Sequence, residues 1–190
     1  MDDAPLPSPA DLSPLELSRI IDTIEERAKH LGEFLRGYTQ FARLPRPRIE
    51  ALKWRTLFMR LSDLVRFELI ATPDDLNAIA HIDRSQIEQA LINLLKNAAE
   101  AGGPPEGVAV RLAAVDAGYE IQVLDRGPGI PPELMSKVLL PFYSTKRTGS
   151  GLGLALCREI VEAHGGSLRI EAREGGGTII TCFLPDPHGP

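Results

Sequence analysis

Apolar side chains recur at alternating three- and four-residue steps from residue 15 to about residue 44, which is the period of an amphipathic helix. The stripe comprises Leu17, Ile20, Ile24, Leu31, Phe34, Tyr38 and Phe41, and it is widened by Ile21, Ala28, Leu35 and Ala42. A stripe this broad is typical of a bundle, so we expect the helix to need a partner helix. Pro45 and Pro47 then end the helix. We therefore expect an extended or disordered lead-in (1–14), a helical segment (15–46) and a domain (47–190).

Beyond the linker, helical and strand periods are mixed. Helices are predicted at residues 54–66, 85–101, 132–138 and 152–164. Strands are predicted at residues 49–52, 68–71, 78–82, 108–115, 119–124, 167–172 and 178–184. The last four strands form two hairpins, around Asp116-Ala117-Gly118 and Gly175-Gly176-Gly177. The order predicts an α/β (α+β) two-layer sandwich, in which a mixed, mostly antiparallel sheet carries helices on one face and follows one long helix.

Composition narrows the class of protein. Hydrophobic residues make up 43% of the 190 residues and charged residues 25%, as in a soluble, core-forming protein. The net charge of −5 argues against nucleic-acid binding, and no apolar run reaches the ~18 residues of a membrane span. We expect a cytoplasmic chain, whether or not the parent protein is anchored in a membrane. Cys157 and Cys182 are interpreted as buried free thiols.

A polar stripe marks the otherwise apolar helix at residues 85–101. Its members are Gln86, Gln89, Asn93, Asn97 and Glu100. A helix that is apolar around most of its girth is buried, so the stripe is expected to line a cavity. Amide oxygens together with phosphate oxygens and water suit Mg²⁺. The alternative is a stripe that faces solvent.

Asp125 ends a predicted strand in phase with Tyr119, Ile121 and Val123, on the expected core face. A carboxylate in that position needs a donor, and the exocyclic amine of adenine would serve. The alternative is an aspartate that only initiates the turn at residues 125–129.

Two glycine clusters follow, at residues 127–129 and 149–153, and they flank a basic segment that contains Lys146. Glycine lets backbone N–H groups approach a ligand, and the second cluster opens a helix whose N-terminus favours an anion. Their order predicts a nucleotide site. The spacing fits neither the P-loop nor the dinucleotide fingerprint, and the motifs of Ser/Thr/Tyr kinases are absent from the sequence.

Five ordered motifs over residues 50–185 resemble the N, G1, F, G2 and G3 boxes of sensor histidine kinases, whose catalytic domain is related to gyrase-like and chaperone-like ATPases. They are Asn93-Leu94-Leu95-Lys96-Asn97-Ala98, Asp125-Arg126-Gly127-Pro128-Gly129, Pro141-Phe142-Tyr143-Ser144-Thr145-Lys146, Gly149-Ser150-Gly151-Leu152-Gly153-Leu154 and Gly175-Gly176-Gly177-Thr178. The resemblance implies an α/β sandwich that binds ATP and Mg²⁺ under a lid at about residues 131–150.

The resemblance also implies roles for individual residues. Asn97 would bind Mg²⁺ with Asn93 assisting at the phosphates, and Asp125 would bind the adenine amine. Asn97 and Lys146 would be the catalytic residues. The remaining ATP-binding residues implied are Gly127, Gly129, Ile130, Phe142, Lys146, Gly149, Ser150, Gly151, Leu152, Gly153 and Thr178.

The first helix resembles the second helix of the dimerisation and phosphoacceptor hairpin, and residues 38–45 resemble sensors of the nitrogen-regulation type. None of the four histidines (His30, His81, His164 and His188) has the acceptor's context of a following acidic residue and a nearby Pro or Thr. We therefore expect a fragment that binds ATP without completing autophosphorylation by itself. The expected partners are the phosphoacceptor hairpin of the same kinase and the receiver domain of a response regulator. The helical stripe either pairs with a second copy or leaves a monomer.

Three alternatives stay open. The related ATPases place a Glu, as the general base, where this chain has Asn93, so the amide favours transfer to a side chain over hydrolysis. A serine kinase acting on an anti-anti-sigma partner would not be expected to carry the long helix. A binding module that senses ATP without transferring phosphate is the third alternative.

Overall fold

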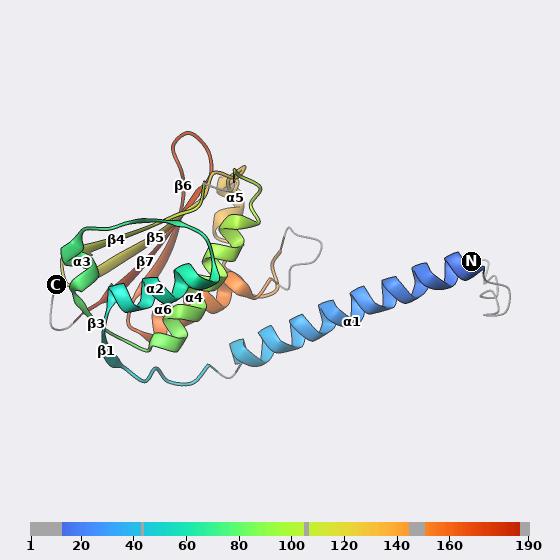
Figure 1. Cartoon of the computed structure of the whole chain (residues 1–190), viewed down its shortest axis with the longest axis horizontal. Coiled ribbons are helices and arrows are strands. Elements are labelled where there is room, and N and C mark those ends of the chain that lie inside the picture. The colour runs from blue at the N-terminus through green and yellow to red at the C-terminus, as the bar shows by residue number, and fades with distance from the viewer. Residues whose placement is uncertain (1–12, 43, 105–106, 145–150, 187–190) are drawn as a thin grey trace.

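Helix α1 (Pro14–Ala42) projects as a long rod from the rest of the molecule (Figure 1). The structure is a computed structural model that describes residues 13–42, 44–104, 107–144 and 151–186. Ser13 caps the helix, because its hydroxyl accepts from the Glu16 N–H at 3.3 Å and its own N–H donates to the Glu16 carboxylate at 2.8 Å. The apolar stripe remains 39–61% exposed at Leu17, Ile20, Ile21, Ile24, Leu31, Leu35 and Tyr38. Helix α6 (Gly153–Ala163) contacts α1, but among the described residues no helix covers the stripe along its length.

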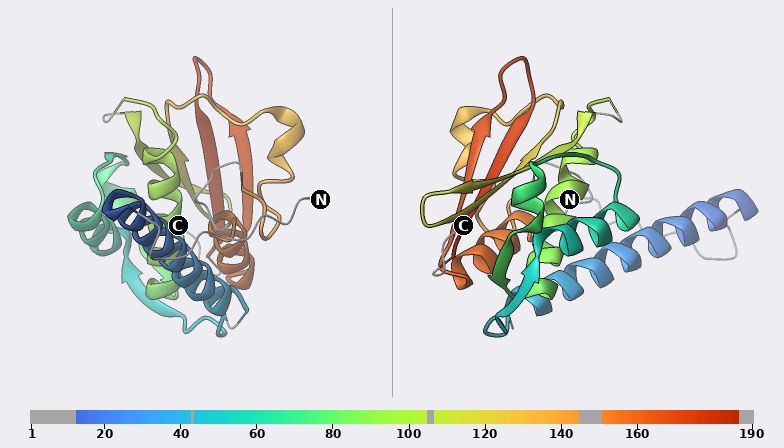
Figure 2. Two further views of the ribbon diagram at one scale, coloured as in Figure 1. Left: turned by 90° about the vertical axis from the view of Figure 1, so that its right-hand side faces the viewer. Right: turned by 60° about the vertical axis from the view of Figure 1, so that its left-hand side comes forward.

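A five-stranded sheet forms one layer of the domain. Its strands run in the order β2 (Glu68–Ile70), β4 (Ala109–Val115), β5 (Gly118–Leu124), β7 (Thr178–Pro185) and β6 (Ser167–Ala172). Only the β2–β4 pair of this sheet is parallel. Helices α2 (Trp54–Leu64), α4 (Arg84–Ala99) and α6 (Gly153–Ala163) lie on one face of it (Figures 1 and 2). The predicted two-layer sandwich is confirmed.

Three smaller elements complete the described part of the domain. Strands β1 (Glu50–Lys53) and β3 (Ile79–Ile82) pair as a separate antiparallel ribbon. Helix α5 (Pro132–Met135) is shorter than the predicted helix. Helix α3 (Pro73–Asn77) was not predicted, because five residues are too few for a periodic pattern. Its capping box, in which Thr72 and Asp75 exchange hydrogen bonds, is a local signal that could have revealed it.

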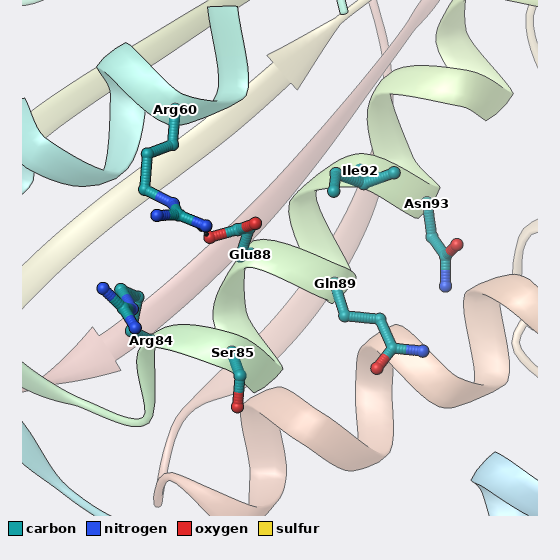
Figure 3. Close-up of a pocket in the computed structure, with 7 residues that line it drawn as sticks. All are labelled: Arg60, Arg84, Ser85, Glu88, Gln89, Ile92 and Asn93. Atoms are coloured by element: carbon teal, nitrogen blue, oxygen red, sulfur yellow. Dashed lines mark hydrogen bonds and ion pairs between the residues drawn. The ribbon is translucent and has the colours of Figure 1, made fainter. Parts of the chain in front are cut away.

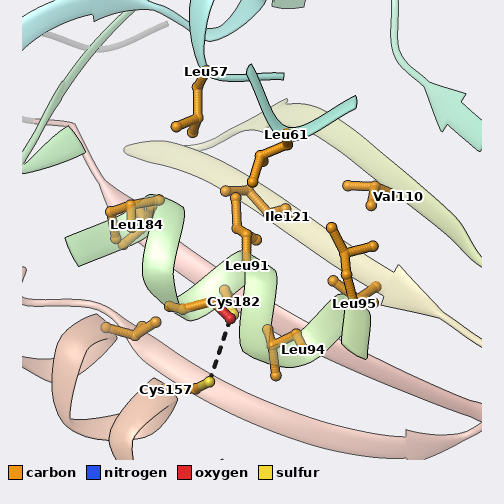
Figure 4. Packing of buried hydrophobic residues seen from close by; sticks show 14 of the residues in the cluster. Leu57, Leu61, Leu91, Leu94, Leu95, Val110, Ile121, Cys157, Cys182 and Leu184 are labelled. Atoms are coloured by element: carbon orange, nitrogen blue, oxygen red, sulfur yellow. Dashed lines mark hydrogen bonds between the residues drawn. The ribbon is translucent and has the colours of Figure 1, made fainter. Parts of the chain in front are cut away.

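The core lies between the sheet and the helical layer. Leu91 and Leu95 of α4 point at Ile121 and Val110 of the sheet, and Leu94 is buried in the same cluster (Figure 4). Trp54 meets the ring of Tyr119 edge-on, with 5.3 Å between centroids.

The two cysteines lie in this core as free thiols, as predicted. Burial raises the pKa of the Cys157 thiol, and it raises the pKa of Cys182 to about 12. Both thiols are therefore unreactive side chains that fill the core.

The β4–β5 turn uses its glycine differently from a usual hairpin turn. The left-handed residue is Ala117 (φ 64°), whereas Gly118 already pairs with Val115. A Cβ on Gly118 would collide with the carbonyl oxygen of Leu184. The glycine is thus needed for the close approach of β7 rather than for a left-handed backbone.

Candidate nucleotide-binding site

A cavity of about 420 Å³ opens between α4, the ends of β5 and β7, α5 and the start of α6. Its volume lies within the usual range of small-ligand sites. The expected site residues in its wall are Asn97, Asp125, Gly129, Ile130, Gly151, Gly153 and Thr178. Residues separated by more than 80 positions in the chain therefore meet around one space.

Asp125 follows β5 and is only 7% exposed. Its Oδ1 accepts hydrogen bonds from the N–H of Gly127 at 2.8 Å and from the N–H of Thr178 at 3.1 Å. Its own N–H donates to the carbonyl of Thr178 at 3.0 Å. Among the described residues, none hydrogen-bonds to Oδ2, so this oxygen can accept from a ligand in the cavity. An exocyclic amine of a base is such a donor.

Another part of the cavity wall is formed by α4 and α6. The side chain of Asn97 lies beside the first residue of α6, since its Nδ2 is 3.8 Å from the position that a Cβ on Gly153 would take. The N-terminus of α6 presents backbone N–H groups that have no partner within the helix, and these groups lie next to the neutral amide of Asn97. Phosphate oxygens fit this corner, and a phosphate-bound Mg²⁺ could complete its shell with the amide oxygen of Asn97.

The base of the expected lid is closed by one hydrogen bond. The N–H of Phe142 donates to the carbonyl of Gly151 at 3.0 Å, and both residues have positive φ, 67° and 69°. A Cβ on Gly151 would lie 2.5 Å from the carbonyl carbon of Phe142, so only glycine fits there. Lys146, Gly149 and Ser150 lie outside the described residues.

Four expected residues do not line the cavity. Gly127 acts indirectly, because its N–H donates a hydrogen bond to the cavity residue Asp125. Leu152 is 1% exposed, and its carbonyl accepts the N–H of Leu156 at the start of α6. Phe142 is 54% exposed. Asn93 lies one turn before Asn97 in the wall of a separate surface groove of about 400 Å³ (Figure 3).

The polar stripe of α4 is therefore divided, contrary to the expectation of a single cavity. Gln89 and Asn93 line the groove, whereas Asn97 and Glu100 line the nucleotide-sized cavity. Gln86 is buried, and its amide donates to the carbonyl of Pro45 at 2.9 Å. A helix turns by about 100° per residue, so a stripe spread over four turns can face two different neighbours.

The sequence reading missed the apolar wall. Leu94, Ala98, Val123, Leu134, Val138, Leu154 and Ile180 line the cavity. Their periodicity marked most of them as core residues, and a core position at the edge of a ligand cavity has the same pattern. Apolar side chains in the same wall as Asp125 suit a purine ring.

The two-layer sandwich carries Asn97, the buried Asp125 and two glycine turns around one cavity, which are the features expected of a nucleotide-binding domain. Residues 82–188 match the family model of the histidine kinase-, DNA gyrase B- and HSP90-like ATPases. The chain belongs to this family.

Individual relatives are sensor proteins. The chain is 35% identical to the C4-dicarboxylate transport sensor protein DctS of Rhodobacter capsulatus, over 90% of this chain and 28% of that protein. It is 33% identical to the nitrogen regulation protein NtrY of Azorhizobium caulinodans, over 86% of this chain and 23% of that protein. The chain thus spans about a quarter of the length of these relatives.

Among solved structures, the catalytic domain of the histidine kinase ThkA is 30% identical, with a TM-score of 0.66 over 73% of this chain and 95% of that one. ThkA in complex with the response regulator protein TrrA gives a TM-score of 0.70 at 26% identity, over 93% of this chain and 53% of that one. Within the ranges that the structure describes, no helix combines the length and the apolar run that a membrane crossing requires.

Proposed function

We propose that this chain is the catalytic part of a sensor histidine kinase, which transfers the γ-phosphate of Mg–ATP to a histidine of a dimerisation hairpin for relay to a response regulator. The observation that carries the proposal is that Asn97 and Asp125 line one and the same cavity. A carboxylate reads the base, and an amide beside a helix N-terminus receives the metal and phosphates. Such a site needs both residues at once.

In the proposed complex, Oδ2 of Asp125 accepts from the adenine amine while Gly129 and Ile130 lie beside the base. Thr178 holds Asp125 through its backbone. The amide oxygen of Asn97 would hold Mg²⁺, whose charge would neutralise the phosphates when the metal is bound. Backbone N–H groups of residues 149–153 and the ammonium of Lys146 receive the phosphates. Asn93 and Phe142, which do not line the cavity, contribute only if the lid region rearranges when nucleotide binds.

The acceptor is proposed to be a histidine other than the four of this chain. His164 has both ring nitrogens engaged, since Nδ1 lies 2.7 Å from the carbonyl of Ile160 and Nε2 accepts the Asp83 N–H at 3.0 Å. His81 Nδ1 lies 3.1 Å from the buried carboxylate of Asp186. These contacts support structural roles for both side chains.

Residues 15–46 are proposed as the second helix of the dimerisation hairpin, with residues 47–190 as the ATP-binding domain. The exposed stripe of α1 supports a homodimer through this helix. The proposed partners are the acceptor hairpin and a receiver domain, and the proposed compartment is the cytoplasm. The complex of ThkA with a response regulator supports the relay.

Phosphotransfer in trans tests the proposal. The purified chain is mixed with a hairpin that carries an acceptor histidine, together with Mg²⁺ and γ-labelled ATP. We expect acid-labile, base-stable phosphate on the hairpin and none on the chain alone. Hydrolysis of ATP without labelling of the hairpin would favour an ATPase, and ATP binding without either product would favour a sensing module.

A further inference from the structure

Asp125 is held at its carbonyl oxygen as well as at its N–H and Oδ1. Arg173, which follows β6, donates from Nη1 to the carbonyl of Asp125 at 2.8 Å. The same nitrogen lies 3.4 Å from the carbonyl of Gly107, a longer and weaker contact. The carbonyl of Asp125 is thus bonded to a guanidinium from a distant part of the chain.

Arg173 also begins the glycine turn that packs against Asp125. Its N–H donates to the carbonyl of Gly177 at 3.0 Å, and its carbonyl accepts from the N–H of Gly176 at 3.0 Å. Gly177 has φ 105°, and a Cβ there would overlap the carbonyl oxygen of Asp125. One side chain therefore ties the backbone of the β6–β7 turn to the backbone of the base-reading residue.

The electrostatics suit a positioning role. Burial lowers the pKa of Arg173, as does the neighbouring Arg126, while Asp125 raises it. A guanidinium stays charged under all ordinary conditions, so its bond to the Asp125 carbonyl is charge-assisted and stronger than a neutral one. The guanidinium binds the backbone carbonyl of Asp125, so it does not occupy Oδ2, which accepts no hydrogen bond from the described residues.

We infer that Arg173 is a positioning residue for base recognition: it fixes the backbone of Asp125 so that Oδ2 meets the 6-amino group of adenine. This inference rests on the proposed function of Asp125. Arg173 itself does not line the cavity, so it acts through Asp125 rather than by touching the nucleotide.

The test compares Mg–ATP with purine riboside 5′-triphosphate, which lacks only the 6-amino group. Calorimetric titration gives the affinity ratio for wild type, Arg173→Gln and the matched control Arg169→Gln. Arg169 lies on β6, four residues before Arg173, and its guanidinium donates instead to the half-buried Glu120 at 2.9 Å.

We expect Arg173→Gln to lower the affinity for ATP about tenfold, the scale of one hydrogen bond to a charged group, and to change the affinity for the analogue less than about twofold. Arg169→Gln leaves both affinities unchanged. An equal loss for both nucleotides, or no loss for either, overturns the inference. If Arg173→Gln does not fold, Arg173→Lys is measured in the same way, because it keeps the charge but loses the reach of the planar fork.

Failure of the underlying function gives a different result. If wild type does not bind ATP, or binds ATP and the analogue equally, the proposed role of Asp125 is wrong and the inference falls with it. If wild type prefers ATP and Arg173→Gln keeps that preference, only the inference about Arg173 is overturned.

Discussion

The ring of Tyr38, near the end of α1, stacks on the ring of Phe142 at the base of the lid, with centroids 6.4 Å apart and an interplanar angle of 28°. Phe142 also closes the lid base through its bond to Gly151. The long helix therefore contacts the segment that borders the nucleotide cavity, so a change in the position of α1 can reach that cavity through an aromatic pair.

A double-mutant cycle measures this contact. Tyr38→Ala and Phe142→Ala should be non-additive in the free energy of unfolding by about 0.5 kcal/mol, at the low end for an aromatic pair because both rings are about half exposed. Urea unfolding supplies the values. The control is a second cycle that combines Ile24→Ala with Phe142→Ala. Because Ile24 lies about four turns earlier on α1, the effects of these two substitutions on the free energy of unfolding should be additive. Additivity for Tyr38 and Phe142 as well would show that the rings do not interact in solution.

Asp125→Asn should weaken ATP binding by roughly 10- to 100-fold, because the amide can keep the two backbone bonds at Oδ1 but places an NH₂ group against the adenine amine. Thermal unfolding should change little, and calorimetric titration gives the affinity. An unchanged affinity would mean that the carboxylate serves the turn alone.

Asn97→Ala should remove the dependence of ATP binding on Mg²⁺, because the variant lacks the amide oxygen that we assign to the metal. The measurement is nucleotide affinity across a Mg²⁺ titration. Lys96→Ala is the control, since Lys96 neighbours Asn97 on α4 but is exposed. A normal Mg²⁺ response in Asn97→Ala would refute the metal assignment.

Asp83 couples stability to acid pH. Burial raises the pKa of Asp83, but hydrogen bonds from Ser85, Arg48 and Gln86 outweigh burial, so the pKa lies below 3.8. Since the folded pKa is depressed, the stabilisation is present above the unfolded pKa and is lost as pH falls through the folded pKa. Asp83→Ala, which also removes the N-cap of α4, should cost about 1 kcal/mol at neutral pH.

The pH dependence of that cost is the measurement. The difference in unfolding free energy between wild type and Asp83→Ala should be constant above about pH 5 and shrink below about pH 4. Other carboxylates contribute equally to the unfolding free energies of wild type and Asp83→Ala, so their contributions cancel in the difference. One of them is Asp75, whose pKa is lowered chiefly by a hydrogen bond from the Thr72 side chain. A difference that persists or grows toward about pH 3 would contradict the assignment.

The sequence singled out Asp125 and Asn97 because each stands in a pattern that is physically unusual. Asp125 interrupts an apolar phase, and Asn97 interrupts an apolar helix, so both residues needed a polar partner in the interior. The buried position of Asp125 and the shared cavity agree with that reasoning.

Other features were not predictable, for reasons that are also physical. Periodicity identifies which face of a strand is buried, but not which long side chain crosses to a neighbouring strand, so nothing in the sequence set Arg173 apart from Arg169. The division of the α4 stripe depends on the packing of α2 and α6 around that helix. The contact between Tyr38 and Phe142 depends on the orientation in which α1 packs against the rest of the chain.

A crystal structure of the chain with Mg²⁺ and a non-hydrolysable ATP analogue tests the central claim most directly. The account predicts the adenine 6-amino group within hydrogen-bond distance of Asp125 Oδ2 and the metal bound to the amide oxygen of Asn97. Nucleotide bound elsewhere, for example in the groove lined by Arg60 and Glu88, or an adenine that turns away from Asp125, would contradict it.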